Sequence, residues 1–293
     1  MVINNVIDPY EKQYMDILFN IMAKGYKQYN ERTKVSTLRV PHAVITVDLE
    51  KEFPILKSKK VGWKTCLKEI LWIMQSQSNN INDLDAHIWD EWADETGSIG
   101  KAYGFQVAKP VTMNGVTYKS QVDYVLSTLA KDSSDRRCVI NLWDVDDLPN
   151  MNLVPCCFSS IWTIVDGKLN CMLNQRSADY LVGVPFNTTQ YALLTILFAR
   201  HLGLKPGRLT HCMADAHVYC YKSHIDGGNQ MLANFNNYYY HMGSPDSVVS
   251  KIINSRHYIE FTSENTDFFE FKVEDIALKD YESFGTIKFD VAI

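Results

Sequence analysis

Three segments carry apolar residues three and four positions apart, the spacing of one face of an α-helix. They cover residues 14–26, 67–75 and 122–129. A longer, mostly apolar run over 187–202 has Asn187 at its start and Gly203 just past its end, where helix caps are expected. We therefore expect a central buried helix with Asn187 at its N-cap, and three further helices.

A strand pattern surrounds Asp166-Gly167, a dipeptide typical of two-residue β-hairpin turns. Residues 158–165 and 168–177 form the two predicted arms, and alternation in the second arm places Arg176 on the face opposite Gln175. Shorter strand-like runs cover 138–143, 258–261, 269–273 and 286–289. Because strands and helices do not alternate regularly, we expect one α+β domain spanning residues 1–293.

Composition narrows the class of protein. Of 293 residues 46% are apolar and 22% charged, no run approaches the roughly 18–20 apolar residues of a membrane helix, and Met1–Tyr10 is too polar for a secretion signal. A net charge of −5 argues against a protein that coats nucleic acid but leaves room for a small anionic ligand. We expect a cytoplasmic protein without a membrane segment or an obligate nucleic acid.

The seven cysteines are odd in number and contain no Cys-x-x-Cys pair, so we expect reduced thiols, no disulfide framework and no metal site. Cys156 ends a loop just before a predicted strand, where a thiol can be exposed, and Cys157 then points the opposite way. Pairing of the hairpin brings Arg176 close to Cys156, and a guanidinium would stabilise a thiolate. The alternatives are a buried structural cysteine and a surface arginine.

Glu69 lies among apolar residues of a predicted helix, where a buried carboxyl has a raised pKa and suits proton transfer. Its alternative is a position at the edge of the apolar stripe. Trp89 and Trp92 flank acidic residues and would either stack on a flat heterocycle or pack into the core.

His217 and Tyr219 share one face of a predicted strand, where they would hydrogen-bond a sugar or serve the structure alone. Asp135-Arg136-Arg137 precedes another strand, and two adjacent arginines are usually solvated surface residues.

Taken together, eight segments in order resemble the thymidylate synthase family across the whole chain. They are Ile88–Glu95, Tyr103–Gln106, Asp135–Arg137, Pro155-Cys156, Gln175–Asp179, Gly183–Asn187, Asp215–Tyr219 and Val291–Ile293. The resemblance implies a twisted mixed sheet covered by helices and packed back-to-back with a second copy in a homodimer.

The same resemblance implies a reaction. Cys156 would add to carbon 6 of dUMP, and carbon 5 would then attack the methylene of 5,10-methylenetetrahydrofolate, a co-substrate. Asn187 would read the base, since its amide matches N3–H and O4 of uracil. The substrate phosphate and sugar would be held by Arg32, Gln175, Arg176, Ser177, His217 and Tyr219. Arg136 and Arg137 would reach the phosphate from the partner subunit.

Glu69 would organise water that moves protons at O4, Tyr103 would assist removal of the carbon 5 proton, and Asp179 would bind the pterin. The residues expected at the folate are Ile88, Trp89, Trp92, Asp179, Val182, Gly183, Phe186, Lys59, Lys60, Val291 and Ala292.

Some positions depart from the family pattern, including Cys157, Val107-Ala108 and Ala214. The alternative within the family is a dUMP hydroxymethylase, in which water attacks the exocyclic methylene and tetrahydrofolate is released. Trp89 and the C-terminal residues would exclude that water, which favours the methyl product. Outside the family, a non-catalytic binder leaves Glu69 and Tyr103 unexplained, and a cysteine hydrolase with His217 as base leaves Asn187 and the arginines unexplained.

Overall fold

A seven-stranded mixed sheet organises the chain, and the computed structural model describes residues 8–239 and 247–291. The strands lie in the order β1-β2-β9-β7-β6-β5, with β8 paired to β9. Their pairings are antiparallel except for β7 with β9 and β8 with β9, which are parallel. The strands are β1 (Tyr26–Asn30), β2 (Val35–Asp48), β5 (Val139–Asn141), β6 (Cys157–Val165), β7 (Lys168–Gln175), β8 (Ala178–Asp179) and β9 (Lys205–Tyr219).

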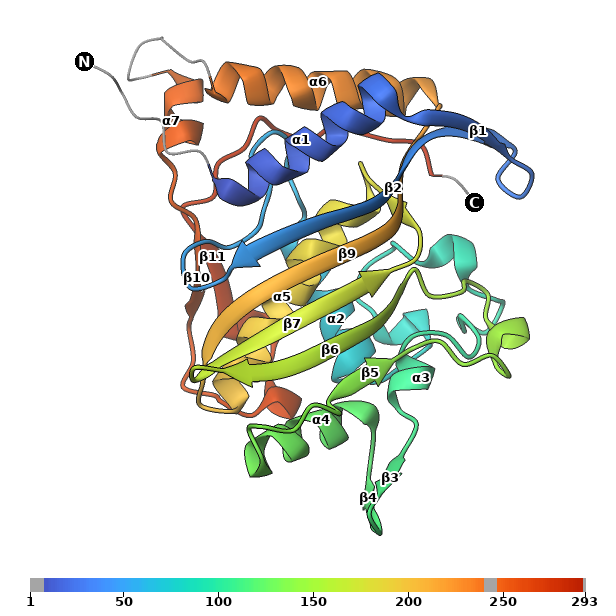
Figure 1. The fold of residues 1–293 in the computed structure, drawn as a ribbon, viewed down its shortest axis with the longest axis vertical. Coiled ribbons are helices and arrows are strands. Elements are labelled where there is room, and N and C mark those ends of the chain that lie inside the picture. Colours follow the sequence, from blue (N-terminus) through green and yellow to red (C-terminus); the bar gives the residue numbers. More distant parts are fainter. Residues whose placement is uncertain (1–7, 240–246, 292–293) are drawn as a thin grey trace.

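Helices cover one face of this sheet, and the mixture of helices and strands confirms the α+β class. In Figure 1, α2 and α5 lie behind the strands, while α1 and α6 run along the β2 edge. The helices are α1 (Pro9–Lys24), α2 (Trp63–Met74), α3 (Gly104–Val107), α4 (Gln121–Lys131), α5 (Gly183–His201), α6 (Lys222–Tyr239) and α7 (Val248–Asn254). Two small hairpins complete the fold: β3 (Val111–Met113) with β4 (Val116–Tyr118), and β10 (Tyr258–Phe261) with β11 (Ile276–Lys279). Within the described ranges, no helix combines the length and the apolar character needed to cross a bilayer.

The hairpin predicted around Asp166-Gly167 is confirmed. Both turn residues have positive φ, 51° and 68°, as a two-residue turn between twisted strands requires. Cys157 pairs with Gln175 across the hairpin, and the Arg176 amide donates to the Cys156 carbonyl at 2.9 Å. The strand pairing therefore brings Arg176 next to Cys156, as the sequence predicted.

Helix α5 is the central buried helix, but its predicted start was wrong. It begins at Gly183 rather than at Asn187, which lies in the second turn and is not the N-cap. The Asp179 carboxylate accepts the Leu181 and Val182 amides at 3.1 and 3.2 Å, so the preceding turn leads into the helix earlier than the apolar run suggested. The predicted end at Gly203 is confirmed, with φ of 66°.

Two predicted strands were wrong. Residues 269–273 overlap two 3-10 turns, Phe268–Glu270 and Val273–Asp275, where Phe268 is buried by packing rather than by strand pairing. Residues 286–289 form no strand. The long strands β2 and β9 were not predicted as runs, because their sequences do not alternate cleanly between apolar and polar residues. Polar side chains such as His211 lie on the buried face.

Candidate active site

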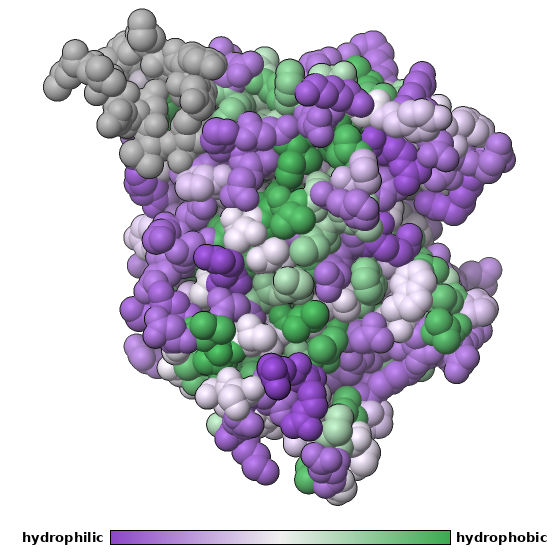
Figure 2. All heavy atoms as spheres, in the orientation of Figure 1, coloured by the Kyte–Doolittle hydropathy of each residue, from purple (hydrophilic) through white to green (hydrophobic). Residues whose placement is uncertain are grey.

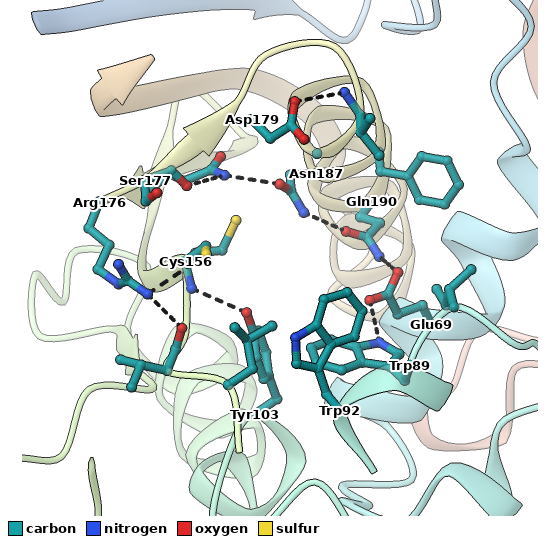
Figure 3. Close-up of a pocket in the computed structure, with 18 of the residues that line it drawn as sticks. Glu69, Trp89, Trp92, Tyr103, Cys156, Arg176, Ser177, Asp179, Asn187 and Gln190 are labelled. Carbon is teal, nitrogen blue, oxygen red and sulfur yellow. Dashed lines mark hydrogen bonds between the residues drawn. The ribbon is translucent and has the colours of Figure 1, made fainter. Parts of the chain in front are cut away.

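A cavity of about 690 Å³ opens where α2, α5 and the ends of β7 and β9 meet. Figure 3 shows Cys156 between Arg176, Tyr103 and Asn187, with Glu69 and Gln190 farther along the wall formed by α2 and α5. Most of the predicted site residues line this cavity: Arg32, Glu69, Ile88, Trp89, Trp92, Tyr103, Cys156, Gln175, Arg176, Ser177, Asp179, Val182, Gly183, Phe186, Asn187, His217, Tyr219 and Val291.

Two cysteines line the cavity. Cys156 is partly exposed, whereas Cys157 is buried, with 4% of its surface exposed. The Arg176 Nη2 lies 3.9 Å from the Cys156 Sγ. The same guanidinium is held by the carbonyls of Val154 and Pro155, at 2.8 and 3.0 Å. Burial raises the pKa of the Cys156 thiol, and the positive charges of Arg176 and Arg32 oppose that rise. Burial has the larger effect, so the arginines only partly favour the thiolate.

Tyr103 is held in a strained conformation, with φ of 42° just before α3. Its hydroxyl accepts the Cys156 amide at 3.2 Å, and its ring packs edge-on against Trp89 at 5.0 Å. The phenol oxygen is thereby fixed next to the cysteine backbone.

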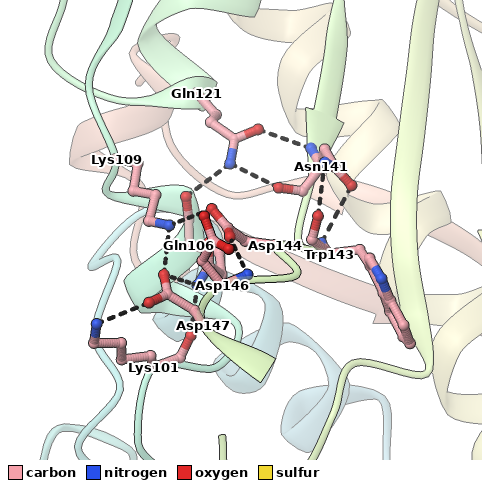
Figure 4. Close-up of polar contacts among 9 residues, drawn as sticks. All are labelled: Lys101, Gln106, Lys109, Gln121, Asn141, Trp143, Asp144, Asp146 and Asp147. Carbon is pink, nitrogen blue, oxygen red and sulfur yellow. Dashed lines mark hydrogen bonds and ion pairs between the residues drawn. The ribbon is translucent and has the colours of Figure 1, made fainter. Parts of the chain in front are cut away.

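The segment that follows Tyr103 is tied to the loop after β5 by a charged network (Figure 4). Asp147 accepts Lys101 at 2.8 Å, Lys109 at 2.5 Å and Gln106 at 3.0 Å. These hydrogen bonds hold the pKa of the Asp147 carboxyl well below its usual range. The network fixes the loop that places Trp143, an unpredicted residue, against the cavity and 5.7 Å from the Arg176 guanidinium.

A continuous chain of side-chain hydrogen bonds forms the opposite wall. Gln175 Nε2 donates to Asn187 Oδ1 at 3.1 Å, and Asn187 Nδ2 donates to Gln190 Oε1 at 3.1 Å. Gln190 Nε2 then donates to Glu69 at 2.6 Å, and Trp89 Nε1 donates to the other oxygen at 2.8 Å. Burial raises the pKa of Glu69 to about 7, although both donors favour its carboxylate. The group can therefore hold or release a proton near neutral pH.

Not all of the arginines predicted to bind the substrate phosphate line the cavity of the described chain. Arg32 reaches the cavity from the turn between β1 and β2. Arg136 and Arg137 are exposed and do not line it, and Arg137 pairs with Asp135 instead. One chain thus supplies Arg32 and Arg176 to the cavity and leaves the adjacent pair on its surface.

His217 and Tyr219 lie side by side at the end of β9, as predicted, with ring centroids 5.2 Å apart. The cavity also reaches Asp290 and Val291 near the C-terminus. Ser223 at the start of α6 donates to the Asp290 carboxylate at 2.6 Å, which holds this segment against the cavity. Ala292 lies outside the described residues.

The two predicted lysines do not line the cavity. Lys59 is buried, and its ammonium donates to the Leu181 carbonyl at 2.6 Å. Burial lowers the pKa of Lys59 to about 8. Lys60 is exposed.

Sequence reasoning missed Gln190, which connects Asn187 to Glu69. It follows Asn187 by three residues on a helix, so the two side chains lie on one face, a signal that could have identified it.

Comparison with known proteins gives one consistent result. A sequence model described as thymidylate synthase matches residues 12–293. The thymidylate synthase of Clostridium beijerinckii is 41% identical over 287 residues, covering 97% of this chain and 99% of that protein. That of Bacillus licheniformis is 35% identical, with 97% and 99% covered. The solved structure of thermostable thymidylate synthase A from Bacillus subtilis superposes with a TM-score of 0.82 at 34% identity, over 97% of this chain and 99% of that one.

Proposed function

The chain belongs to the thymidylate synthase family, and from this premise we propose a role for each group in its cavity. The enzyme transfers a one-carbon unit from 5,10-methylenetetrahydrofolate to carbon 5 of dUMP, yielding dTMP and dihydrofolate. The observation that carries the assignment of roles is the position of Cys156, which lies between the Arg176 guanidinium and the Asn187 side-chain amide in one cavity. We propose that residues 1–293 form one catalytic domain.

Cys156 acts as the nucleophile. Its sulfur forms a bond to carbon 6 of the uracil, and the electrons of the C5–C6 double bond move towards carbon 5 and O4. Carbon 5 then attacks the methylene of the folate. Support comes from the cavity position of the thiol and from the guanidinium of Arg176, which with Arg32 opposes the rise in its pKa.

Asn187 and Glu69 act on the opposite edge of the base. Asn187 offers Oδ1 to N3–H and Nδ2 to O4, each atom having one hydrogen-bonding position left after its contact with a glutamine. Glu69, with a pKa of about 7, moves protons through water at O4. Tyr103, beside the Cys156 amide, assists removal of the carbon 5 proton.

Asp179 binds the pterin, and the apolar side chains around it contact the folate. The buried Trp89 and the segment that contains Asp290 and Val291 exclude water from the exocyclic methylene. This exclusion supports hydride transfer from tetrahydrofolate over attack by water.

A second copy of the chain completes the phosphate site. Within the described residues no helix covers the sheet face turned to the viewer in Figure 1, and apolar side chains are grouped over this face in Figure 2. Val44, Val139 and Met172 are exposed here, on strands whose alternate residues are buried. Packing of two such faces forms the homodimer and carries Arg136 and Arg137 to the partner's cavity.

Product analysis tests the proposed function. Purified protein is incubated with dUMP and 5,10-methylenetetrahydrofolate, and the nucleotide is identified by mass spectrometry while dihydrofolate is followed by absorbance. We expect dTMP and dihydrofolate in equal amounts, and neither with Cys156→Ala. A nucleotide heavier by one oxygen atom, without dihydrofolate, would instead identify a hydroxymethylase.

A further inference from the structure

His211 lies outside the cavity but is connected to it. It is fully buried on β9, and its Nε2 is 2.6 Å from the Gln175 Oε1. Its Nδ1 is 3.0 Å from the Thr188 hydroxyl on α5. His211 thus joins, at Gln175, the hydrogen-bond chain that begins at Glu69.

That chain has a direction, because each carboxamide accepts at its oxygen and donates at its nitrogen. At one end the Glu69 carboxylate accepts, which turns the Gln190 nitrogen towards it and the Gln190 oxygen towards Asn187. At the other end the Ser177 carbonyl accepts the Gln175 nitrogen at 3.0 Å. Both ends require the same orientation of the amides between them.

This orientation leaves the Gln175 oxygen facing His211, so His211 must donate its Nε2–H. Burial without a facing carboxylate lowers the pKa of His211 to about 3, so the ring is neutral and carries one proton. With that proton on Nε2, the Nδ1 lone pair faces the Thr188 hydroxyl, whose single proton lies between Nδ1 at 3.0 Å and the Val184 carbonyl at 2.8 Å.

The orientation of Asn187 decides which base it matches. As placed, it offers an acceptor to N3–H and a donor to O4 of uracil. A reversed amide would offer a donor to N3 and an acceptor to the 4-amino group of cytosine. We propose that His211 is a positioning residue: its donation to Gln175 joins the contacts with Glu69 and Ser177 in holding Asn187 in the orientation that accepts uracil and rejects cytosine.

The proposal rests on the proposed function, since it assumes a pyrimidine nucleotide in the cavity. Leucine at position 211 removes the donor and leaves the buried Gln175 oxygen unsatisfied. Glutamine at the same position keeps an N–H donor at comparable reach. His211→Leu and His211→Gln are therefore a matched pair that separates the hydrogen bond from the bulk of the side chain.

Calorimetric titration with dUMP and with dCMP provides the first test. We expect His211→Leu to narrow the preference for dUMP over dCMP about tenfold, and His211→Gln to keep it within about threefold. A purely structural role would weaken the binding of both nucleotides alike and leave the ratio of their dissociation constants unchanged. An unchanged ratio in folded His211→Leu overturns the proposal.

Nitrogen NMR of the His211 ring in the unaltered protein gives a second test that does not depend on how the variants fold. We expect the neutral ring with the proton on Nε2, and a ring protonated on Nδ1 alone overturns the proposal. Neither test uses turnover, so a protein that fails to convert dUMP but gives both expected results would contradict the proposed function and leave the positioning role intact.

Discussion

Two walls of the cavity are built differently. The base wall is formed by Glu69, Gln190 and Gln175, which are buried, and by Asn187, which is half-buried; its side chains are joined within one chain. The phosphate wall begins with Arg32 and Arg176 and lacks the exposed pair at 136–137. Under the proposed function, the groups that recognise the base are positioned during folding, whereas recognition of the phosphate awaits a partner subunit.

Desolvation explains this difference. A buried amide or carboxyl without a hydrogen bond destabilises the folded state, so the base wall must be satisfied before any ligand arrives. Clustered guanidinium groups repel one another without an anion and remain hydrated at the surface. In the proposed homodimer two of these guanidinium groups come from the other subunit, so they meet the first two only once the dimer has formed.

Removing the nucleophile should have the largest effect on turnover, although both walls of the cavity stay intact. We expect Cys156→Ala to lower kcat by more than about 10⁴-fold, because no other group can form the bond to carbon 6. Calorimetry should still show dUMP binding within a few-fold of the unaltered protein. Substantial turnover in this variant would contradict covalent catalysis.

Breaking the base wall at Glu69 should have the next largest effect. Glu69→Gln loses the titrating carboxyl and should reduce kcat by about 10²- to 10³-fold. In the unaltered protein the pH dependence of kcat should include a group near pH 7, the pKa that burial gives Glu69.

Glu52 provides a matched control, since burial also raises its pKa to about 7 and it lies outside the cavity. Steady-state kinetics of Glu52→Gln should keep the group near pH 7. If that group disappears in Glu52→Gln and persists in Glu69→Gln, the assignment to Glu69 is wrong.

Breaking the phosphate wall should act mainly on KM. The double variant Arg136→Ala/Arg137→Ala should raise the KM for dUMP about 10- to 100-fold through lost charge-assisted hydrogen bonds. Added salt should weaken dUMP binding less in the variant than in the unaltered protein. Lys131→Ala removes an exposed cation at the end of the nearby α4 and should leave KM unchanged.

The smallest effect concerns stability. Glu69 has a pKa near 4.5 when unfolded and about 7 when folded, so the native protein binds more protons between those values. The free energy of unfolding should therefore fall as pH rises from about 4.5 to about 7. Urea unfolding at several pH values measures this slope, and Glu69→Gln should reduce it.

The sequence predicted those parts of the molecule that depend on local pattern. The hairpin at Asp166-Gly167 followed from its turn residues and brought Arg176 to Cys156. The start of α5 did not follow, because the turn before it is held by the Asp179 carboxylate, which accepts the Leu181 and Val182 amides. His211 was missed because its strand carries polar groups inward, where they pair with residues distant in sequence.

Subunit mixing tests most directly the claim that one wall is complete in a single chain and the other is shared. Cys156→Ala and Arg136→Ala/Arg137→Ala protomers are unfolded, mixed in equal amounts and refolded together. Activity is measured at a dUMP concentration far below the KM of the arginine variant, where neither variant alone is active. If the arginines act across the interface, the mixture should recover about a quarter of the unaltered activity, since half of the dimers are mixed and each has one complete site. Activity no greater than that of the two variants refolded separately would contradict the shared site.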